Sequence, residues 1–258
     1  MLKYCVRSPK KHLFYKNLQV NMIDYKPDAT KNEVENFYDK YTKSQTKIGV
    51  NIRHRTIVKH LKKLNLKANS KVLEIGCGIG TVSSLILKHI PNGKFVGVDI
   101  SKESIELAKK YNSVHKNAEF IANDMSDFTH TLKFDFIVFP DVLEHIPVEQ
   151  HSNLFKNVAK VCNKNTTVLI NIPEPNFLNW IRKTMPDKLQ IIDQSLSMQD
   201  LLNNTYPHGF KLSSMQNYSL YYEENDFTSI VLKTDMSHDN YTLKSTLQRG
   251  TENFFSKM

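Results

Sequence analysis

The sequence predicts an α/β fold built on a doubly wound, mostly parallel sheet. The prediction depends on three observations. Short apolar runs alternate with amphipathic helical segments through the middle of the chain. The stretch "VLEIGCGIG" at residues 72–80 joins a buried strand to a helix through a glycine-rich turn. The last two apolar runs, 211–222 and 227–233, leave no room for a helix between them, which predicts a terminal antiparallel hairpin.

Two helices are expected ahead of the first strand. Thr30 and Glu33 have the spacing of a capping box, and apolar residues then recur at helical spacing, so one helix is expected over about 31–43. A second helix is expected over 51–64. Residues 1–29 are polar and basic and are expected to form a loosely held arm.

The alternating part of the chain supplies the sheet and its covering helices. A helix is expected directly after the glycine turn, and Ser101 and Pro147 are suited to begin two more. Residues 173–209 form an insert before the hairpin, and 234–258 form a polar tail. The expected strands are 72–75, 94–99, 118–122, 134–139 and 167–172, and the further helices lie at 102–111, within 148–161, and at 198–204.

Composition is typical of a globular protein, with 40% hydrophobic and 24% charged residues in a chain of 258. No apolar run approaches the length of a membrane span, and the N-terminus lacks the apolar region of a secretory signal. The three cysteines, Cys5, Cys77 and Cys162, are odd in number and unevenly spaced, which suggests neither a disulfide framework nor a zinc site. A reducing cytoplasmic location is therefore expected.

Positive charge is concentrated at the start of the chain. Residues 1–70 contain 16 Lys or Arg and 5 Asp or Glu, a net of 16 − 5 = +11, whereas the remainder has a net of 19 − 21 = −2. The basic segment either attracts an anionic substrate, a nucleic acid or an acidic surface, or is an ordinary solvated helical face.

Polar residues stand at the carboxyl ends of the expected strands, where doubly wound sheets bind their ligands. Glu74 and the glycines end the first strand, and Asp99 ends the second, well placed to accept ribose hydroxyls. Asp124 follows the third and could accept an adenine amine, with Ile100 and Met125 as apolar faces for the ring. The glycine turn lacks the G-x-G-x-x-G spacing of a dinucleotide site, so an adenosine without a pyrophosphate is favoured.

The strings "VLEIGCGIG", "VGVDIS" and "PDVLEHIP" make residues 30–233 resemble a class I S-adenosylmethionine-dependent methyltransferase of the small-molecule, ubiquinone-pathway-like type. The resemblance implies a seven-stranded Rossmann-like sheet, a helical cap from residues 30–70, and conversion of S-adenosyl-L-methionine to S-adenosyl-L-homocysteine. The residues that it assigns to the cofactor are Glu74, Gly76, Cys77, Gly78, Gly80, Asp99, Ile100, Asn123, Asp124, Met125 and Pro140.

The catalytic candidates follow the fourth strand. A hydroxyl acceptor needs its proton removed, which favours His145 as general base, with Asp141 as positioning group or alternative base. Asp141, Glu144 and His145 also resemble the E-x-x-E-H metal site of ubiquinone-pathway and small-RNA methyltransferases, with Asp in place of the first Glu. A divalent or ferric ion is thus an alternative.

Several functions fit these residues. O-methylation of a small metabolite or natural-product intermediate is preferred, and N-methylation is chemically close. RNA methylation is favoured by the basic head segment, and a non-catalytic cofactor-binding regulator is a further alternative. Trp180 in the insert is expected to help roof the acceptor site. Neither the acceptor nor the oligomeric state follows from the sequence.

Overall fold

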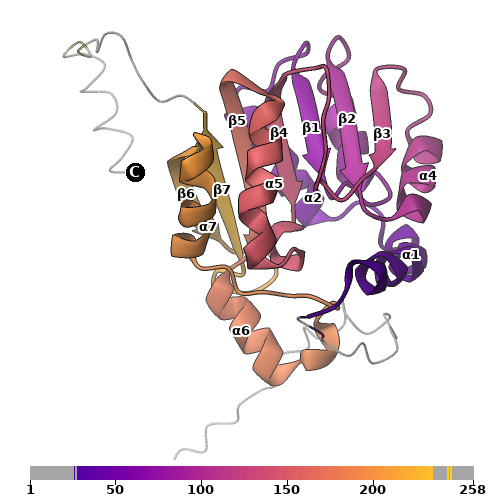
Figure 1. Cartoon of the computed structure of the whole chain (residues 1–258), viewed down its shortest axis with the longest axis vertical. Coiled ribbons are helices and arrows are strands. Elements are labelled where there is room, and N and C mark those ends of the chain that lie inside the picture. Colours follow the sequence, from indigo (N-terminus) through magenta and orange to yellow (C-terminus); the bar gives the residue numbers. More distant parts are fainter. Residues whose placement is uncertain (1–25, 27, 235–242, 244, 246–258) are drawn as a thin grey trace, which may run out of the picture.

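The computed structural model describes residues 26, 28–234, 243 and 245 (Figure 1). The arm expected at 1–29 and the tail expected at 234–258 lie almost entirely outside these residues. Among the described residues, no helix has the length and apolar character that crossing a membrane requires.

A seven-stranded sheet forms the centre of the fold, in the order β3-β2-β1-β4-β5-β7-β6. The first five strands are parallel, and β7 runs antiparallel to both of its neighbours. The expected seven strands and terminal hairpin are therefore confirmed. The strands are β1 (Lys71–Ile75), β2 (Lys94–Asp99), β3 (Ala118–Ala122), β4 (Phe134–Pro140), β5 (Cys162–Pro173), β6 (Lys211–Tyr218) and β7 (Phe227–Lys233).

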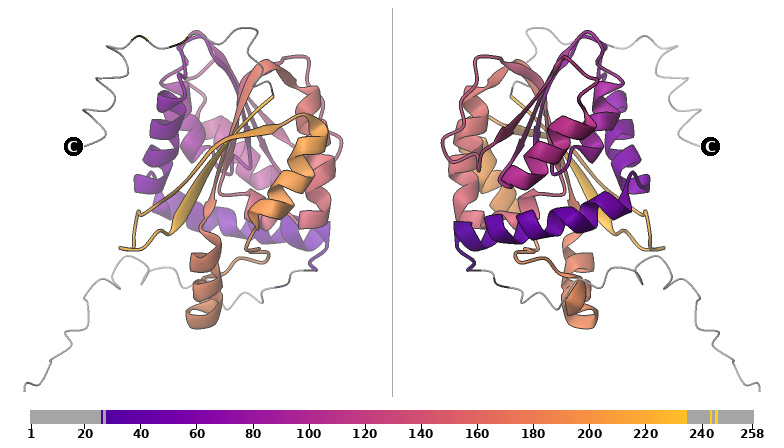
Figure 2. Two further views of the ribbon diagram at one scale, coloured as in Figure 1. Left: turned by 90° about the vertical axis from the view of Figure 1, so that its left-hand side faces the viewer. Right: turned by 90° about the vertical axis from the view of Figure 1, so that its right-hand side faces the viewer.

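Helices cover both faces of this sheet (Figures 1 and 2). One apolar cluster joins α2 (Ile52–Lys63), α3 (Thr81–Leu87) and α4 (Lys102–Tyr111) to one face. The other joins α5 (Val148–Lys160) and α7 (Met198–Thr205) to the opposite face. Strands such as β1 alternate between the clusters, with Val72 in the first and Leu73 in the second, which explains why they read as continuous apolar runs.

The helix α1 (Lys31–Ile48) lies across the carboxyl ends of the strands (Figure 2). The predicted capping box is present, since the Thr30 hydroxyl accepts from the Glu33 amide and the Glu33 carboxylate accepts from Thr30. The helix is longer than the predicted 31–43 because polar helix-forming residues continue it until Gly49, which has a φ of 62°.

The insert contains a helix at a place where none is predicted from the sequence. α6 (Pro175–Thr184) begins where the Glu174 side chain accepts from the Phe177 amide, with Pro175 in the first turn. β6 ends at Tyr218 and not at the expected 222, because buried Asp226 accepts from the amides of Leu220 and Tyr221 and folds that segment into a loop. Short 3-10 turns occur at Leu143–His145, Pro186–Lys188 and Tyr206–His208.

Candidate cofactor and acceptor site

The turn after β1 brings three glycines under α1. Gly76, Gly78 and Gly80 all have positive φ, which L side chains rarely adopt. A Cβ atom on Gly76 would lie 2.4 Å from Val142, and one on Gly78 would lie 3.3 Å from the Gln45 amide. Glycine is therefore required for the backbone to pass so close to the segment after β4 and to α1.

Glu74 is fully buried beneath this turn. One of its carboxylate oxygens accepts from the Ser83 hydroxyl at 2.7 Å, and the other has no hydrogen-bond partner. Burial raises the pKa of Glu74 to about 8. A buried carboxyl with an unsatisfied oxygen is suited to a ligand that brings hydrogen-bond donors or positive charge to this turn.

Asp99 at the end of β2 ties the glycine turn to the next loop. Its carboxylate accepts from the Gly78 amide at 2.7 Å and from the Ser101 amide at 2.9 Å. Burial raises the pKa of Asp99, which these two amides oppose. Each oxygen keeps acceptor capacity for a further donor such as a ribose hydroxyl. Glu74 and Asp99 thus offer hydrogen-bond acceptors on either side of the glycine turn, an arrangement that fits a methionine-linked adenosine.

Asp124 lies at the end of β3, on the side expected for an adenine. Its carboxylate accepts from Ser126 and forms a 2.5 Å ion pair with Lys31 of α1. Burial raises the pKa of Asp124, but Lys31 and Ser126 together outweigh it and lower the pKa. Asn123 accepts from the Met125 amide at 2.6 Å and so shapes the same turn.

Contacts from α1 reach these strand ends along its length. Asp39 accepts from the Ser101 hydroxyl at 2.5 Å, and the hydroxyls of Thr42 and Ser104 are 3.0 Å apart. Gln45 faces Gly78, and its side-chain oxygen is buried without a hydrogen-bond partner. α1 is therefore the element that closes the cofactor side of the site.

A second group of polar residues lies at the ends of β4 and β5. Asp141 has a φ of 56°, and its carboxylate accepts from the Asn171 amide at 2.5 Å. The Tyr218 hydroxyl donates to the Asn171 side-chain oxygen, and Arg53 Nε lies 3.0 Å from Asp141. Burial raises the pKa of Asp141, while Arg53 and Asn171 oppose the rise. Because Val142 packs on Gly76, this network adjoins the methionine end of the predicted cofactor site.

His145 is buried in the 3-10 turn after β4, with partners at both ring nitrogens. Its Nδ1 is 2.6 Å from the Ile192 carbonyl oxygen and 3.1 Å from the Asp193 carboxylate. Its Nε2 is 3.0 Å from the Gln190 side-chain amide. Burial lowers the pKa of His145, but Asp193 and Glu144 outweigh it and raise the pKa to about 9.

The alternative metal site is not assembled in this structure. Among the described residues, no three His, Cys, Asp or Glu side chains are grouped so that they could hold an ion. Asp141 is turned toward Arg53 and Asn171, whereas His145 is turned toward Gln190 and Asp193. Glu144 is 1% exposed, and burial raises its pKa to about 8.

The remaining predicted residues are placed as follows. Cys77 packs against Gly97 and Met125 lies in an apolar cluster, so both side chains are buried, at 5% and 2% exposure. Pro140 ends β4 opposite Asn171, and half-buried Ile100 follows Asp99. Trp180 on α6 is 43% exposed and stacks on Phe177.

Several residues of the site are not among those that the sequence indicates, and three of them lie near the catalytic candidates. Gln190 and Asp193 contact His145 from an irregular stretch of the insert, and Tyr218 reaches Asn171 from β6. No periodicity marks the first two positions. The tyrosine could have been found from its place at the end of a strand.

The fold is that of the class I S-adenosylmethionine-dependent methyltransferases. Residues 72–165 match the family model described as "Methyltransferase domain". The chain therefore carries a domain of this class, in agreement with the resemblance noted in the sequence. The methyltransferase family uses S-adenosylmethionine as its cofactor.

Curated relatives share part of this domain. Malonyl-[acyl-carrier protein] O-methyltransferase 1 of Ilyobacter polytropus is 38% identical over 71 residues, which are 28% of this chain and 26% of that protein. A ubiquinone biosynthesis O-methyltransferase of Coxiella burnetii is 30% identical over 113 residues, 43% of this chain and 46% of that protein. The chain spans about half or less of the length of the curated relatives that it matches.

Among solved structures, magnesium protoporphyrin IX methyltransferase from Synechocystis PCC 6803 with bound S-adenosylhomocysteine has a TM-score of 0.62 to this chain. The two are 18% identical, and the match covers 80% of this chain and 99% of that one. At this level of identity the likeness concerns the fold, which is the seven-stranded methyltransferase sheet.

Proposed function

We propose that this chain transfers a methyl group from S-adenosylmethionine to an oxygen atom of a small-molecule acceptor. The observation that carries the proposal is the glycine turn flanked by Asp99 and by buried Glu74, which has one oxygen without a partner. The names of the relatives from Ilyobacter polytropus and Coxiella burnetii, both O-methyltransferases, support oxygen as the acceptor atom.

Bound S-adenosylmethionine supplies an activated methyl group, so the chain's own contribution is mainly positioning. We assign the methionine end to the glycine turn and Glu74, the ribose to Asp99, and the adenine to Asp124. Asp141, held by Arg53 and Asn171, orients the acceptor next to that turn. α1 excludes water from the cofactor side.

His145 is the proposed proton acceptor. Asp193 and the Ile192 carbonyl hold the proton on Nδ1, which leaves Nε2 as the nitrogen that exchanges protons with the acceptor hydroxyl. In this structure Gln190 covers Nε2, so the proposal requires its side chain to give way to the acceptor. Because the pKa of His145 is about 9, the neutral base form is scarce near pH 7 and increases with pH.

The first test is calorimetry with S-adenosylhomocysteine on the wild type and Asp99→Ala. Binding by the wild type and an at least tenfold weaker Kd for the variant are expected, because the two ribose acceptors are lost. Incubation of the wild type with labelled donor and metabolite extract should then label a small molecule. Absence of binding by a folded wild type would contradict the cofactor assignment, and binding without labelling of any acceptor would favour a non-catalytic regulator.

Once an acceptor is in hand, the pH profile tests His145. The wild-type kcat should rise with pH toward about 9, and His145→Gln should lower kcat and remove this rise. A parallel assay with a chelator tests the metal-assisted alternative. An unchanged pH profile in His145→Gln would assign the proton to another group.

A further inference from the structure

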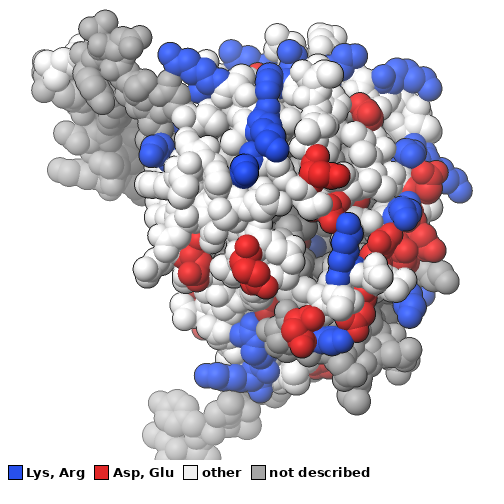
Figure 3. Space-filling model, viewed as in Figure 1, with Lys and Arg blue, Asp and Glu red and all other residues white. Residues whose placement is uncertain are grey.

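Lysine side chains gather at the end of the sheet where the parallel strands begin, whereas basic and acidic side chains are mixed at the other end. In the view of Figure 3, Lys and Arg side chains follow the upper rim, where the strands begin, and most acidic side chains lie lower on that face. The carboxyl ends carry Asp39, Asp124, Glu149, Glu174 and Asp226. The opposite end carries a row of lysines, which we name the lysine edge.

The lysine edge arises from the winding of the chain. Helices of a doubly wound sheet run antiparallel to the strands, so each last helical turn meets the first residue of the next strand at the same end. Lysines occupy both of these positions and the loops between them. The lysine edge consists of Lys62, Lys63, Lys67, Lys71, Lys88, Lys94, Lys109, Lys110, Lys116, Lys133, Lys160, Lys164, Lys211 and Lys233.

Local electrostatics account for only part of this row. Lysines in the last turns of α2 and α4 complement the helix dipoles. Lys67, Lys71, Lys94 and Lys116 stand in loops or at strand starts, are exposed, and form no ion pair among the described residues. A helix dipole therefore does not explain these four.

Few acidic residues lie near the lysine edge to offset its positive charge, and those that do already have partners within the protein. Glu106 pairs with Lys109, and Glu119 lies 3.3 Å from His130. Asp135 accepts from the Lys71 backbone amide and from Asn163. The edge thus presents a net positive potential to solvent along its length.

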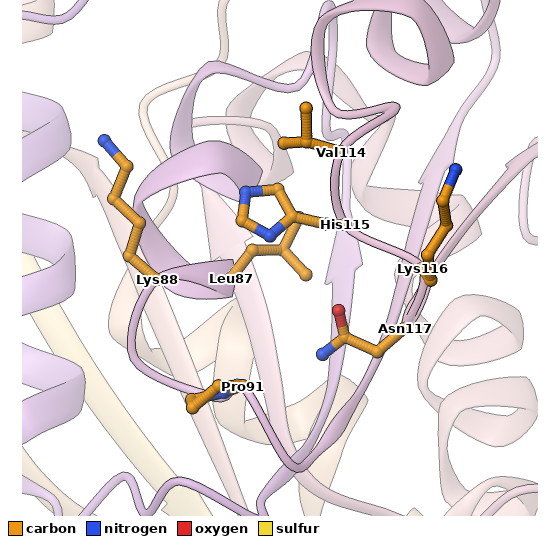
Figure 4. A pocket seen from close by; sticks show the side chains of 7 residues that line it. All are labelled: Leu87, Lys88, Pro91, Val114, His115, Lys116 and Asn117. Atoms are coloured by element: carbon orange, nitrogen blue, oxygen red, sulfur yellow. The ribbon is translucent and has the colours of Figure 1, made fainter.

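A shallow cavity of about 630 Å³ opens within the lysine edge. Lys88 from the end of α3 and Lys116 from the loop before β3 lie on opposite sides of it, with His115 between them (Figure 4). Val114 and Asn117 complete that loop's share of the lining. An anionic group entering this cavity would meet cations from two separate loops.

We propose that the lysine edge binds a single-stranded nucleic acid through its phosphates. All of the cations in the edge are lysines, which contact phosphates as point charges and carry little base specificity. Exposed Tyr111 near one end of the row offers a ring on which a base can stack, and Tyr206 near the other end is exposed with Lys211 Nζ 4.8 Å from its ring centroid. Their exposed fractions are 51% and 40%.

The shape of the edge favours a single strand over a duplex. Seven strands about 4.8 Å apart extend over roughly 29 Å. Each strand is rotated by roughly 20° from its neighbour, so the row turns through more than about 100°. A flexible strand can follow such a path freely, whereas a duplex with a persistence length of about 50 nm must be bent at a cost in free energy.

An anionic membrane fits the edge less well. Peripheral binding needs apolar side chains that enter the bilayer together with the basic ones. Of the large apolar side chains that are exposed within residues 28–234, Tyr111, Val114 and Tyr206 stand at this end of the sheet. The lysine edge also lies at the end of the sheet opposite the cofactor residues, so a strand bound there is a docking partner and not the methyl acceptor.

The test is fluorescence anisotropy with a labelled single-stranded RNA of about twenty nucleotides, a length that spans one such site. The full chain should bind it, with log K falling by about 0.7 per phosphate contact for each tenfold rise in salt. The variant K67Q/K71Q/K94Q/K116Q should bind at least tenfold more weakly and show a shallower salt slope. Its fold is checked by circular dichroism and by S-adenosylhomocysteine binding.

A matched variant, K40Q/K47Q/K183Q/K188Q, removes the same charge from α1, α6 and the turn after it, near the carboxyl ends of the strands. It should bind the RNA within twofold of the wild type. The proposal is overturned by no RNA binding, by equal losses in the two variants, by equal or tighter binding of a duplex of the same length, or by a preference for phosphatidylglycerol vesicles.

Discussion

At the scale of single residues, Glu74 combines a stability cost with a proposed binding role. Its carboxyl group is buried in β1 with one oxygen lacking a partner, and burial raises its pKa to about 8. In an unfolded chain the same group titrates near 4.5. The folded state therefore holds a proton that the unfolded state releases between these two values, so ligand-free stability falls as pH rises from about 4.5 to about 8.

Glu74→Gln should weaken this pH dependence and also weaken cofactor binding. Without ligand, the variant should lose less free energy of unfolding than the wild type between pH 5 and 8, as measured by urea unfolding. Part of the dependence will persist because burial also raises the pKa of Glu144 to about 8. Calorimetry should show at least a tenfold weaker Kd for S-adenosylhomocysteine. Identical pH slopes for wild type and variant would contradict the assignment.

At the scale of elements, α1 covers the candidate cofactor site, and we expect it to limit access. It contacts the loops after β1, β2 and β3 through Gln45, Asp39 and Lys31. The exposed ion pair between Lys31 and Asp124 is expected to add little. The short hydrogen bond from Ser101 to Asp39 is half-buried and charge-assisted, so it is the stronger tie between α1 and the sheet.

Asp39→Ala should accelerate cofactor binding. Loss of a hydrogen bond to a charged group costs about 1.5–3 kcal/mol, which would increase the open population of α1 roughly tenfold or more. Stopped-flow measurement with S-adenosylhomocysteine should therefore show a higher association rate constant. Lys47→Ala, on the exposed last turn of the same helix, serves as the control and should leave the rate unchanged. Equal rates in all three proteins would mean that α1 does not limit entry.

At the scale of the whole molecule, the terminal hairpin belongs to the core. β7 lies between β5 and β6, and six of its seven residues are buried. β6 closes the sheet and is mostly exposed. Ile230 and Met215 are register partners on these two strands but differ in exposure, at 1% and 45%.

Ile230→Ala should destabilise the whole protein by about 2–5 kcal/mol, because a buried cavity replaces the side chain. Met215→Ala at the neighbouring position should stay within about 0.5 kcal/mol of the wild type. Urea unfolding should show a lower midpoint with an unchanged m value for the first variant. A small effect at Ile230 would mean that the hairpin unfolds separately from the parallel sheet.

Much of the fold could be predicted because its signals are local. Short apolar runs located the strands, and Thr30 and Ser101 correctly marked helix starts. The predicted end of β6 was wrong because a side chain later in the sequence sets it. Asp226 ends β6 at Tyr218 by accepting hydrogen bonds from two backbone amides. Glu174 caps the first turn of α6, a local signal that the prediction did not use.

The sequence by itself indicated the class of the domain, through motifs that resemble a known family, and the strand-end residues Glu74, Asp99 and Asp124, because apolar runs show where the strands end. Only the tertiary structure decided how α1 covers them, which groups hold Asp141 and His145, and that lysines gather at one edge. The net charge of −2 after residue 70 gives no sign of the lysine edge, because acidic residues elsewhere in that part of the chain offset the lysines. Contacts and charge clusters of this kind join residues far apart in the chain, and long-range packing alone brings them together.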